Sequence, residues 1–381
     1  MLVLGIAGAA VPFSTADSGP PLLATGSVAV CAAPPPGYAM CLSQRPTAPQ
    51  GASAKPNGFA PRTIKSVYGF PTSAKAGKDQ TVAITVSFHS PDAERNLRKF
   101  SEQFGLPPCT KDNGCFRQVD QNGGTNYPAG TDEGWALEAD LDVQWVHAIA
   151  PGAKIVLVEA TDNILINLLK SVDTAAILGR YVSNSWVSLA GESPVEHLFD
   201  HHFQVPGVSF FFGSGDAPQV YYPSASPSVI SVGGTSLFVN GDGLFKKETA
   251  WGSAGGGCSA YEPASAAQAA FAQYPQAGCN GMRATPDVSL VADPDTGVSV
   301  YTTLGGKRGW FVIGGTSAST PMVAARAAIT GAFVEQGFVY GNAIGFRDIT
   351  VGSNGGPCLI GFDLCSGRGS WSDGTGWPPL P

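Results

Sequence analysis

Apolar runs alternate with helix-like segments along the middle of the chain. The apolar runs predict strands at 81–88, 154–160, 181–186, 208–212 and 227–233, and the segments between them predict helices at 91–105, 133–150, 163–178 and 194–203. Near-continuous apolar strands are typical of strands buried on both faces, and their alternation with helices is typical of parallel sheets. The pattern therefore predicts an α/β fold with a mostly parallel central sheet between two layers of helices. No internal repeat or second domain is evident.

A glycine turn separates another short strand, at 310–313, from a helix of small residues. The turn and helix start read Gly314-Gly315-Thr316-Ser317-Ala318-Ser319-Thr320-Pro321. Such a turn lifts one side chain clear of the backbone and points the helix N-terminus at it, which suits a nucleophilic serine because developing negative charge meets free N–H groups. The alternative is an ordinary helix start capped by serine and threonine.

Two carboxylates lie one turn apart on the helix predicted at 133–150. Glu138 and Asp142 are four residues apart and therefore share a face. Like charges at this spacing destabilise an isolated helix by about 0.2–0.5 kcal/mol, so the pair has no structural benefit of its own. If it is partly buried, the two groups can share a proton and one can act as a base. The alternative is a solvated acidic face, since Asp140 lies between them.

A third acid follows the strand predicted at 208–212. Asp216 ends the sequence Gly213-Ser214-Gly215-Asp216, at the carboxyl end of that strand. Active sites of parallel sheets lie at these ends, although aspartate in a glycine-rich turn is also ordinary turn chemistry. The five histidines lack the spacing of a metal site, and a Ser-His-Asp hydrolase remains an open alternative.

The eight cysteines fall into local couples. The couples are Cys31/Cys41, Cys109/Cys115, Cys258/Cys279 and Cys358/Cys365. An even count with short spacings and no Cys-x-x-Cys pair predicts four disulfides in an oxidising compartment rather than a zinc site; the alternative is eight unrelated thiols. The net charge of −7 and the lack of basic runs argue against a nucleic-acid partner.

The N-terminal region differs in composition from the rest of the chain. Residues 1–13 are apolar like a signal-peptide core but lack a basic start, so 1–30 is interpreted as a truncated leader. Residues 31–60, rich in proline and alanine, are expected to form an extended arm pinned by two cysteines, with order beginning near Pro61. No other segment reaches the roughly 18 apolar residues of a membrane span. A secreted protein without a membrane partner is expected.

Several motifs, taken in order, resemble the sedolisins, the serine-carboxyl peptidases. They are Glu138-x-x-Leu141-Asp142, Ser183-Asn184-Ser185-Trp186, Ser214-Gly215-Asp216, Tyr222-Pro223-Ser224, Pro286-Asp287-Val288-Ser289 and Gly315-Thr316-Ser317-Ala318-Ser319-x-Pro321. The resemblance covers about residues 61–369, taken as the peptidase domain. Because only about 60 residues precede that domain, the chain resembles the short bacterial members without a large pro-domain.

The resemblance implies a subtilisin-like fold and a secreted, acid-active serine endopeptidase that acts on proteins or peptides as a monomer. Ser317 would be the nucleophile, Glu138 its general base, and Asp142 the group that orients Glu138 and shares protons with it. Asp216 would stabilise the oxyanion, which requires a protonated carboxyl because a carboxylate would repel the negative charge.

The resemblance also implies a calcium loop at 346–365. Asp348 and Asp363 would give carboxylate oxygens, and Ile349, Leu359 and Gly361 would give backbone carbonyls to one structural Ca²⁺ ion. This mixture of hard oxygen ligands suits calcium. Two solvated loop aspartates are the alternative.

Four features depart from the family pattern. Val86 stands where relatives usually carry an acid, Val187 where a glycine is usual, and Ala217 where a serine is usual. The tail at 370–381 is also atypical. These departures leave a weakly active or inactive secreted binding protein on the same scaffold as an alternative.

Overall fold

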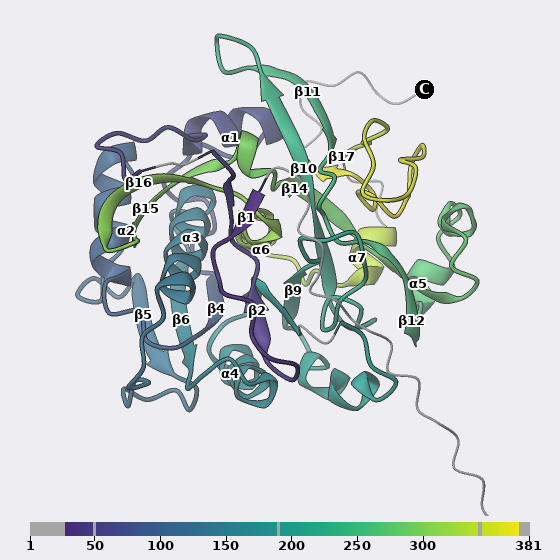
Figure 1. The fold of residues 1–381 in the computed structure, drawn as a ribbon, viewed down its shortest axis with the longest axis horizontal. Coiled ribbons are helices and arrows are strands. Elements are labelled where there is room, and N and C mark those ends of the chain that lie inside the picture. The colour runs from purple at the N-terminus through teal and green to yellow at the C-terminus, as the bar shows by residue number, and fades with distance from the viewer. Residues whose placement is uncertain (1–26, 49–50, 189–190, 342–344, 373–381) are drawn as a thin grey trace, which may run out of the picture.

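The structure is a computed structural model that describes residues 27–48, 51–188, 191–341 and 345–372. Most of the expected leader and most of the atypical tail therefore lie outside the described residues. Figure 1 shows one central sheet with helices packed against it.

The central sheet has ten strands in the order β17-β18-β14-β10-β9-β7-β4-β6-β5, with β11 paired to β10. Neighbouring strands are parallel except at β10–β11 and β17–β18. The bounds are β4 (Thr81–Ser87), β5 (Phe116–Asp120), β6 (Lys154–Ala160), β7 (Tyr181–Asn184), β9 (Ser209–Gly213), β10 (Ile230–Val239), β11 (Phe245–Ala250), β14 (Val288–Val291), β17 (Phe346–Arg347) and β18 (Ser370–Trp371). The predicted parallel sheet is confirmed.

Helices cover both faces of this sheet, as predicted. On one face α3 (Glu133–Ile149) and α6 (Thr316–Thr330) pack against each other, with α2 (Ala93–Phe104) and α1 (Pro61–Tyr68) beside α3. On the other face α4 (Leu165–Leu178) packs on β4, β6 and β7. Shorter helical segments are η1 (Glu196–Phe203), α5 (Ala266–Ala269), η2 (Tyr274–Ala277), η3 (Pro294–Thr296) and α7 (Gln336–Gly341). The contact between α3 and α6 brings the predicted acids and the predicted nucleophile together.

Several elements differ from the sequence prediction. The segment predicted as a helix at 194–203 is the 3₁₀ helix η1, and the short strand expected at 310–313 is part of a hairpin, β15 (Val298–Leu304) and β16 (Lys307–Ile313). The β12 (Gly257–Pro263) and β13 (Met282–Thr285) pair was not predicted. These strands lie outside the central sheet, so they lack the continuous apolar pattern on which the prediction relied.

The N-terminal arm is part of the fold. Its strands β1 (Ser27–Ala29) and β3 (Gln44–Pro46) pair with each other, and β2 (Ala39–Cys41) pairs antiparallel with β8 (Trp186–Ser188). In Figure 1 this purple segment crosses the middle of the view beside α3 and α6. The prediction that order begins near Pro61 was wrong, because the arm is held by the domain rather than by its own sequence pattern.

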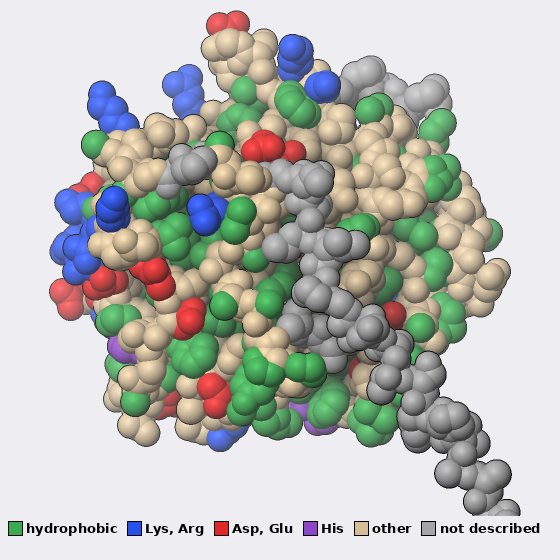
Figure 2. Space-filling view, in the orientation of Figure 1, with side chains coloured by type: hydrophobic (Ala, Val, Ile, Leu, Met, Phe, Trp, Pro, Cys, Tyr) green, Lys and Arg blue, Asp and Glu red, His purple; other side chains and the backbone are tan. Residues whose placement is uncertain are grey.

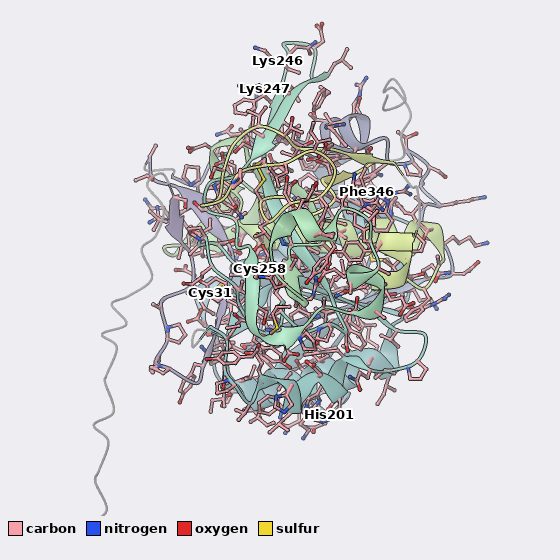
Figure 3. All side chains as sticks on the ribbon, turned by 90° about the vertical axis from the view of Figure 1, so that its right-hand side faces the viewer. Cys31, His201, Lys246, Lys247, Cys258 and Phe346 are labelled. Carbon is pink, nitrogen blue, oxygen red and sulfur yellow. A yellow bond between two sulfur atoms is a disulfide. The ribbon has the colours of Figure 1, made fainter. Side chains whose placement is uncertain are left out.

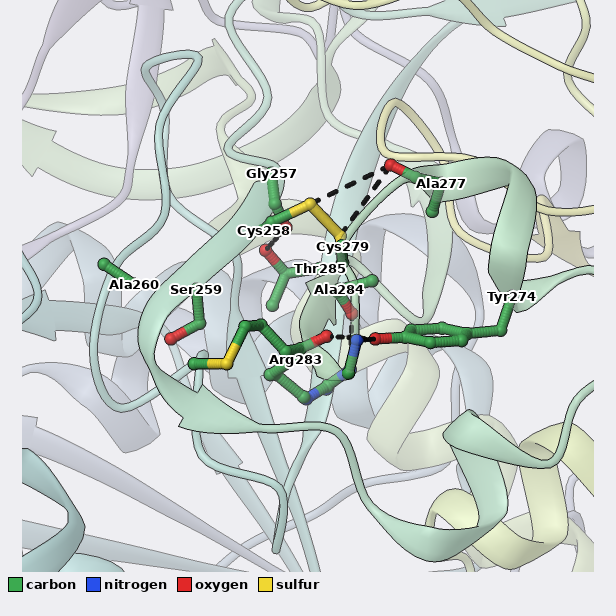
Figure 4. The surroundings of a disulfide bond; sticks show 12 residues. Gly257, Cys258, Ser259, Ala260, Tyr274, Ala277, Cys279, Arg283, Ala284 and Thr285 are labelled. Carbon is green, nitrogen blue, oxygen red and sulfur yellow. Dashed lines mark hydrogen bonds between the residues drawn. A yellow bond between two sulfur atoms is a disulfide. The ribbon is translucent and has the colours of Figure 1, made fainter.

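All four predicted disulfides are present, and no cysteine is left free. Their Cα atoms lie 4.9–5.8 Å apart, within the usual range for this bond. Figure 4 shows Cys258–Cys279, where both sulfur atoms lie near the carbonyl of Ala277. The oxidising compartment itself stays a prediction.

On the face drawn in Figure 2, outside its grey atoms, Lys and Arg side chains lie mainly at the margins and several stand beside Asp or Glu. Lys246 and Lys247 project at the tip of the β10–β11 hairpin (Figure 3). No helix within the described ranges is long and apolar enough to cross a membrane.

Candidate active site

Ser317 lies in the first turn of α6, where the glycine turn was expected to place it. The residue before the helix, Gly315, has a φ of 91°, a conformation that favours glycine. A Cβ atom there would lie 1.7 Å from the carbonyl oxygen of Leu42 and 2.9 Å from Asp216 Oδ2. Glycine at this position therefore leaves a small space shared by those two oxygens. Ser317 itself is completely buried.

Glu138, on α3, accepts the hydroxyl of Ser317. The Ser317 Oγ atom lies 2.8 Å from Glu138 Oε2. The same carboxylate oxygen also accepts the Ser43 backbone N–H at 2.9 Å and the Ser43 hydroxyl at 2.6 Å. Three donors on one oxygen favour its unprotonated form, so Oε2 is the atom able to take a proton from Ser317.

Asp142 lies one turn further along α3, and its Oδ1 atom accepts the Ser185 hydroxyl at 2.7 Å. Glu138 Oε1 and Asp142 Oδ2 are both buried and have no hydrogen-bond partner among the described residues. Burial raises the pKa of Glu138 to about 8, although the hydrogen bonds from Ser43 and Ser317 oppose the rise. Burial, and then the charge of Glu138, raises the pKa of Asp142. Both effects favour a pair that retains one proton near neutral pH.

The alternative of a solvated acidic face is wrong for this helix. Glu138 and Asp142 have no exposed surface, and Asp140 is 4% exposed. Asp140 points away from the pair, because its Oδ2 atom accepts hydrogen bonds from Asn96 at 2.8 Å and Thr302 at 2.7 Å. The three acids of α3 therefore belong to two separate buried environments.

Asp216 approaches Ser317 from the carboxyl end of β9. Its Oδ1 atom accepts the backbone N–H of Thr316 at 2.8 Å and the Thr316 hydroxyl at 2.9 Å. Its Oδ2 atom is buried without a hydrogen-bond partner among the described residues. Burial raises the pKa of Asp216 to about 7, although both Thr316 contacts oppose the rise. In acid, the carboxyl can therefore donate a hydrogen bond from Oδ2.

Residues of the arm complete the site, and sequence reasoning missed them. Ser43 is 95 positions from Glu138, and neither residue carries a pattern that reveals the contact. The neighbouring Leu42 is completely buried in a cluster with Val187, Ala217 and Tyr221. Two of the departures from the family pattern, Val187 and Ala217, thus belong to the same apolar cluster as this leucine. Val86 lies buried in β4.

No histidine within the described residues is bonded to Ser317. His89 pairs with Glu159, His202 with Asp173, and His147 with the carbonyl of Pro107. His201 contacts the Leu198 carbonyl on η1, at the lower surface in Figure 3. The described geometry gives no support to a Ser-His-Asp triad.

In the predicted calcium loop, both aspartates accept hydrogen bonds from backbone N–H groups of the loop itself. Asp348 Oδ2 accepts the Gly361 N–H at 2.8 Å, and Asp363 Oδ2 accepts the Leu359 N–H at 2.8 Å. Asp348 Oδ1 is buried with no partner among the described residues, and Asp363 is 1% exposed. Asp363 is therefore not a solvated loop aspartate, whereas Asp348 is half-buried. Asp363 Oδ1 accepts hydrogen bonds from the Cys365 and Ser366 N–H groups and from the Ser366 hydroxyl. Asp348 Oδ1, which has no such partner among the described residues, is therefore the oxygen that best fits a hard cation.

Comparisons with known proteins identify relatives of the chain. A sequence model of the subtilase family matches residues 134–336, more than half of the chain. Kumamolisin of Bacillus sp. (strain MN-32) is 30% identical over 364 residues, covering 86% of this chain. Sedolisin of Pseudomonas sp. (strain 101) is 25% identical over 394 residues, covering 89% of this chain. The chain spans 62% of the length of each of these relatives.

Solved structures show the same fold. The structure of Pseudomonas sedolisin, a serine-carboxyl proteinase complexed with two molecules of pseudo-iodotyrostatin, has a TM-score of 0.67 and 24% identity, covering 84% of this chain and 96% of that one. The S41 psychrophilic protease has a TM-score of 0.54 and 16% identity, covering 84% of this chain and 99% of that one. The predicted subtilisin-like fold is confirmed.

Proposed function

The chain belongs to the subtilase family, and on this premise we propose that it is a sedolisin, a secreted, acid-active serine-carboxyl endopeptidase. The observation that carries the proposal is the 2.8 Å hydrogen bond from Ser317 Oγ to the carboxylate of Glu138 in a fully buried site. A carboxylate there can take the proton that a histidine takes in other serine hydrolases. Its substrates are proteins or peptides, and the four disulfides support secretion.

In the proposed reaction, Ser317 attacks the carbonyl carbon of a peptide while its proton passes to Glu138 Oε2. The oxyanion that forms accepts a hydrogen bond from protonated Asp216. Glu138 then gives its proton to the departing nitrogen, the C–N bond breaks, and an ester to Ser317 remains. Water, deprotonated by Glu138, hydrolyses the ester and Ser317 regains its proton.

Asp142 is proposed to hold the second proton of the carboxyl pair. A proton shared between Glu138 Oε1 and Asp142 Oδ2 would satisfy two buried oxygens that otherwise have no hydrogen-bond partner among the described residues. It would also leave Oε2, the atom that faces Ser317, free to act as the base. Ser185 fixes the other oxygen of Asp142.

We further propose one structural calcium ion in the loop at 346–365. Asp348 and Asp363 would hold it together with the carbonyls of Ile349, Leu359 and Gly361, and the ion would offset the charge of the two aspartates. Calcium at about 100 times its Kd should raise the free energy of unfolding by about 2.7 kcal/mol. Denaturant titration of wild type and Asp348→Asn, with calcium or chelator, measures this effect. An equal stability of wild type in both solutions would refute the ion.

The second candidate, an inactive secreted binding protein, is favoured by the complete burial of Ser317. Labelling with a fluorophosphonate probe separates the two candidates, because only an activated serine reacts. The test of the proposed activity is hydrolysis of a denatured protein across about pH 2.5 to 8. Ser317→Ala should abolish cleavage and the exposed control Ser73→Ala should keep it. Unchanged turnover in Ser317→Ala would end the proposal.

A further inference from the structure

Ser185 is the joint between strands β7 and β8, beside the carboxyl pair of Glu138 and Asp142. Its hydroxyl donates to Asp142 Oδ1 at 2.7 Å, and within the described ranges no other residue bonds to that carboxyl. Its backbone carbonyl lies 3.4 Å from Ser317 Oγ. Ser185 thus faces the nucleophile with its main chain and the second acid of the pair with its side chain. Mutation of the side chain leaves the carbonyl in place.

The Ser185 hydroxyl determines which oxygen of Asp142 can carry a proton. In a protonated carboxyl group, one oxygen carries the hydrogen and the other accepts hydrogen bonds. Because Oδ1 accepts from Ser185, the hydrogen belongs on Oδ2, which is buried and has no partner among the described residues. Glu138 Oε1 is also buried without a partner there. A proton on Asp142 Oδ2 is therefore the one that the pair can share.

The side chains on either side of Ser185 are both tied to one hydroxyl, that of Thr85 on β4. Thr85 Oγ1 donates to Asn184 Oδ1 at 2.6 Å and accepts the indole N–H of Trp186 at 2.9 Å. The amide N–H of Asn184 donates in turn to the Phe211 carbonyl at 3.1 Å. All of these residues are completely buried. Ser185 cannot turn away from the pair without breaking such bonds and leaving buried polar groups unpaired.

Thr85 stands out from the residues that follow it on β4. It lies opposite Asn184 in the parallel pairing of β4 with β7. The next residue, Val86, is apolar and buried, and the buried hydroxyl of Ser87 has no hydrogen-bond partner among the described residues. Of the last three positions of this strand, Thr85 alone therefore holds the joint through its side chain.

On the basis of the proposed function, we infer that Thr85 is a positioning residue for the proton of the carboxyl pair and that it acts through Ser185. Thr85 holds both neighbours of Ser185, and Ser185 holds Asp142 Oδ1. As Ser317 gives its hydroxyl proton to Glu138 Oε2, the shared proton passes from Glu138 Oε1 to Asp142 Oδ2. Each carboxyl then carries one proton, and Asp142 does not have to rotate.

A hydroxyl donor matters here because no Lys, Arg or His among the described residues bonds to the pair. Besides each other, the two carboxyls face Asp216, from the carboxyl end of β9. Burial, and to a smaller extent the charge of Asp216, raises the pKa of Glu138 to about 8. Burial, and then the charge of Glu138, raises the pKa of Asp142, and the Ser185 hydroxyl opposes that rise. Loss of this donor should let the pair take its second proton at a higher pH.

The pH–rate profile of peptide hydrolysis by the full chain, with kcat and KM measured separately, tests the role of Ser185. Ser185→Ala should lower kcat by about 10–100-fold and move the acid limb up by about one pH unit. KM should stay the same, because the backbone carbonyl remains. Ser183→Ala is the matched control and should behave like wild type. Ser183 is equally buried on the same strand, and its hydroxyl has no partner among the described residues.

The same profile tests Thr85. Thr85→Val removes the hydroxyl and should move kcat and the acid limb in the same direction as Ser185→Ala but less, by about 3–10-fold in kcat. Thr85→Ser keeps the hydroxyl and should restore both. Thr302→Val, the same change at a buried threonine bonded to Asp140, should move neither. Combining Thr85→Val with Ser185→Ala should leave the acid limb where Ser185→Ala puts it, because both changes act on one contact.

Nuclear magnetic resonance of isotope-labelled side-chain carboxyls gives a readout that needs no turnover. The signal that disappears in Asp142→Asn identifies this group. In Ser185→Ala its proton affinity should rise about tenfold, and in Ser183→Ala it should stay unchanged. Circular dichroism and urea denaturation establish that each variant is folded and how stable it is.

The two readouts separate positioning from a merely structural role and from the activity itself. A Thr85→Val variant that loses stability but keeps the wild-type acid limb and the wild-type titration of Asp142 would overturn the inference. An unchanged titration in Ser185→Ala would overturn it as well, and wild-type hydrolysis would then leave the proposed function standing. If wild type cleaves no peptide at any pH while the titration shifts as expected, the proposed function fails and the positioning of the proton stands.

Discussion

Two groups of buried carboxyls in this molecule have opposite surroundings. Asp287 accepts hydrogen bonds from both terminal guanidinium nitrogens of Arg283, at 2.8 and 2.5 Å, and Glu248 accepts one from Arg347 at 2.7 Å. Glu138 and Asp216 instead accept hydrogen bonds from neutral groups, among them serine and threonine hydroxyls and backbone N–H groups. The first group is paired with full positive charge, whereas the second group has none.

The difference shows that a buried carboxyl can serve two purposes. It stabilises the fold when a positive charge lies beside it, and it can exchange protons when no such charge is present. A buried carboxylate next to a guanidinium stays ionised, because the opposite charge offsets its lost hydration. Without a cation, burial disfavours the charged form, and the pKa of Asp216 rises to about 7. The uncompensated carboxyls can therefore exchange protons near neutral pH, which general acid–base catalysis requires.

The largest effect is expected from removing the proposed base. Glu138→Gln keeps the shape of the side chain but cannot take the proton of Ser317, so turnover should fall by about 10³–10⁴-fold. Peptide hydrolysis under substrate saturation measures this loss. Asp140→Asn is the matched control, since it removes another buried acid of α3 that faces Asn96 and Thr302, and it should retain activity. Equal losses of turnover in Glu138→Gln and Asp140→Asn would contradict the assignment of Glu138 as the base.

For the carboxyls paired with arginine, removal of the partner should lower the free energy of unfolding rather than the activity. Arg283→Met leaves Asp287 buried without its counter-charge, and the free energy of unfolding should fall by about 3–5 kcal/mol. Urea denaturation checks this value. The double variant Arg283→Met with Asp287→Leu should recover most of the loss, because no isolated charge remains. A loss below about 1 kcal/mol in the single variant would show that the pair does not matter.

A smaller effect concerns the pH dependence of stability. Burial raises the pKa of Asp140 to about 7 and that of Glu196 to about 8. A raised pKa gives stability that is complete below the unfolded value near 4 and is lost as pH rises through the folded value. Buried His147, whose pKa is lowered to about 4, acts in the opposite direction. Because carboxyls with a raised pKa outnumber this histidine, we expect a higher melting temperature at pH 5 than at pH 8.

Asp140→Asn isolates one of these groups. The variant should reduce the difference in unfolding free energy between pH 5 and pH 8 by an amount on the order of 1 kcal/mol, because the amide does not titrate. Denaturant titrations at the two pH values give the difference. An unchanged difference would mean that Asp140 does not titrate in this window.

The sequence predicted the parallel sheet and three of its buried strands well, because β4, β6 and β9 are near-continuous apolar runs. It also singled out Ser317, Glu138, Asp142 and Asp216, which the structure brings together. The spacing of Glu138 and Asp142 placed them on one face, but only the fold shows that this face is buried.

The arm could not be predicted in the same way. Its contacts with Glu138, Ser185 and Gly314 join positions far apart in the chain, and its composition resembles that of a linker. A segment whose backbone bonds are supplied by another part of the fold needs no periodic pattern of its own. The Cys31–Cys41 couple was the only signal that the arm is anchored.

The most direct test of the proposed mechanism is the pH–rate profile of peptide hydrolysis by the full chain and by its Asp216→Asn variant. Activity should be confined to acid and should fall as pH rises through about 7, the pKa to which burial raises Asp216. At lower pH it should fall again when the Glu138–Asp142 pair takes a second proton. Asp216→Asn should move or remove the upper limb, because its amide donates a hydrogen bond at any pH. An optimum above pH 8, or an upper limb unchanged by Asp216→Asn, would contradict a protonated carboxyl at the oxyanion.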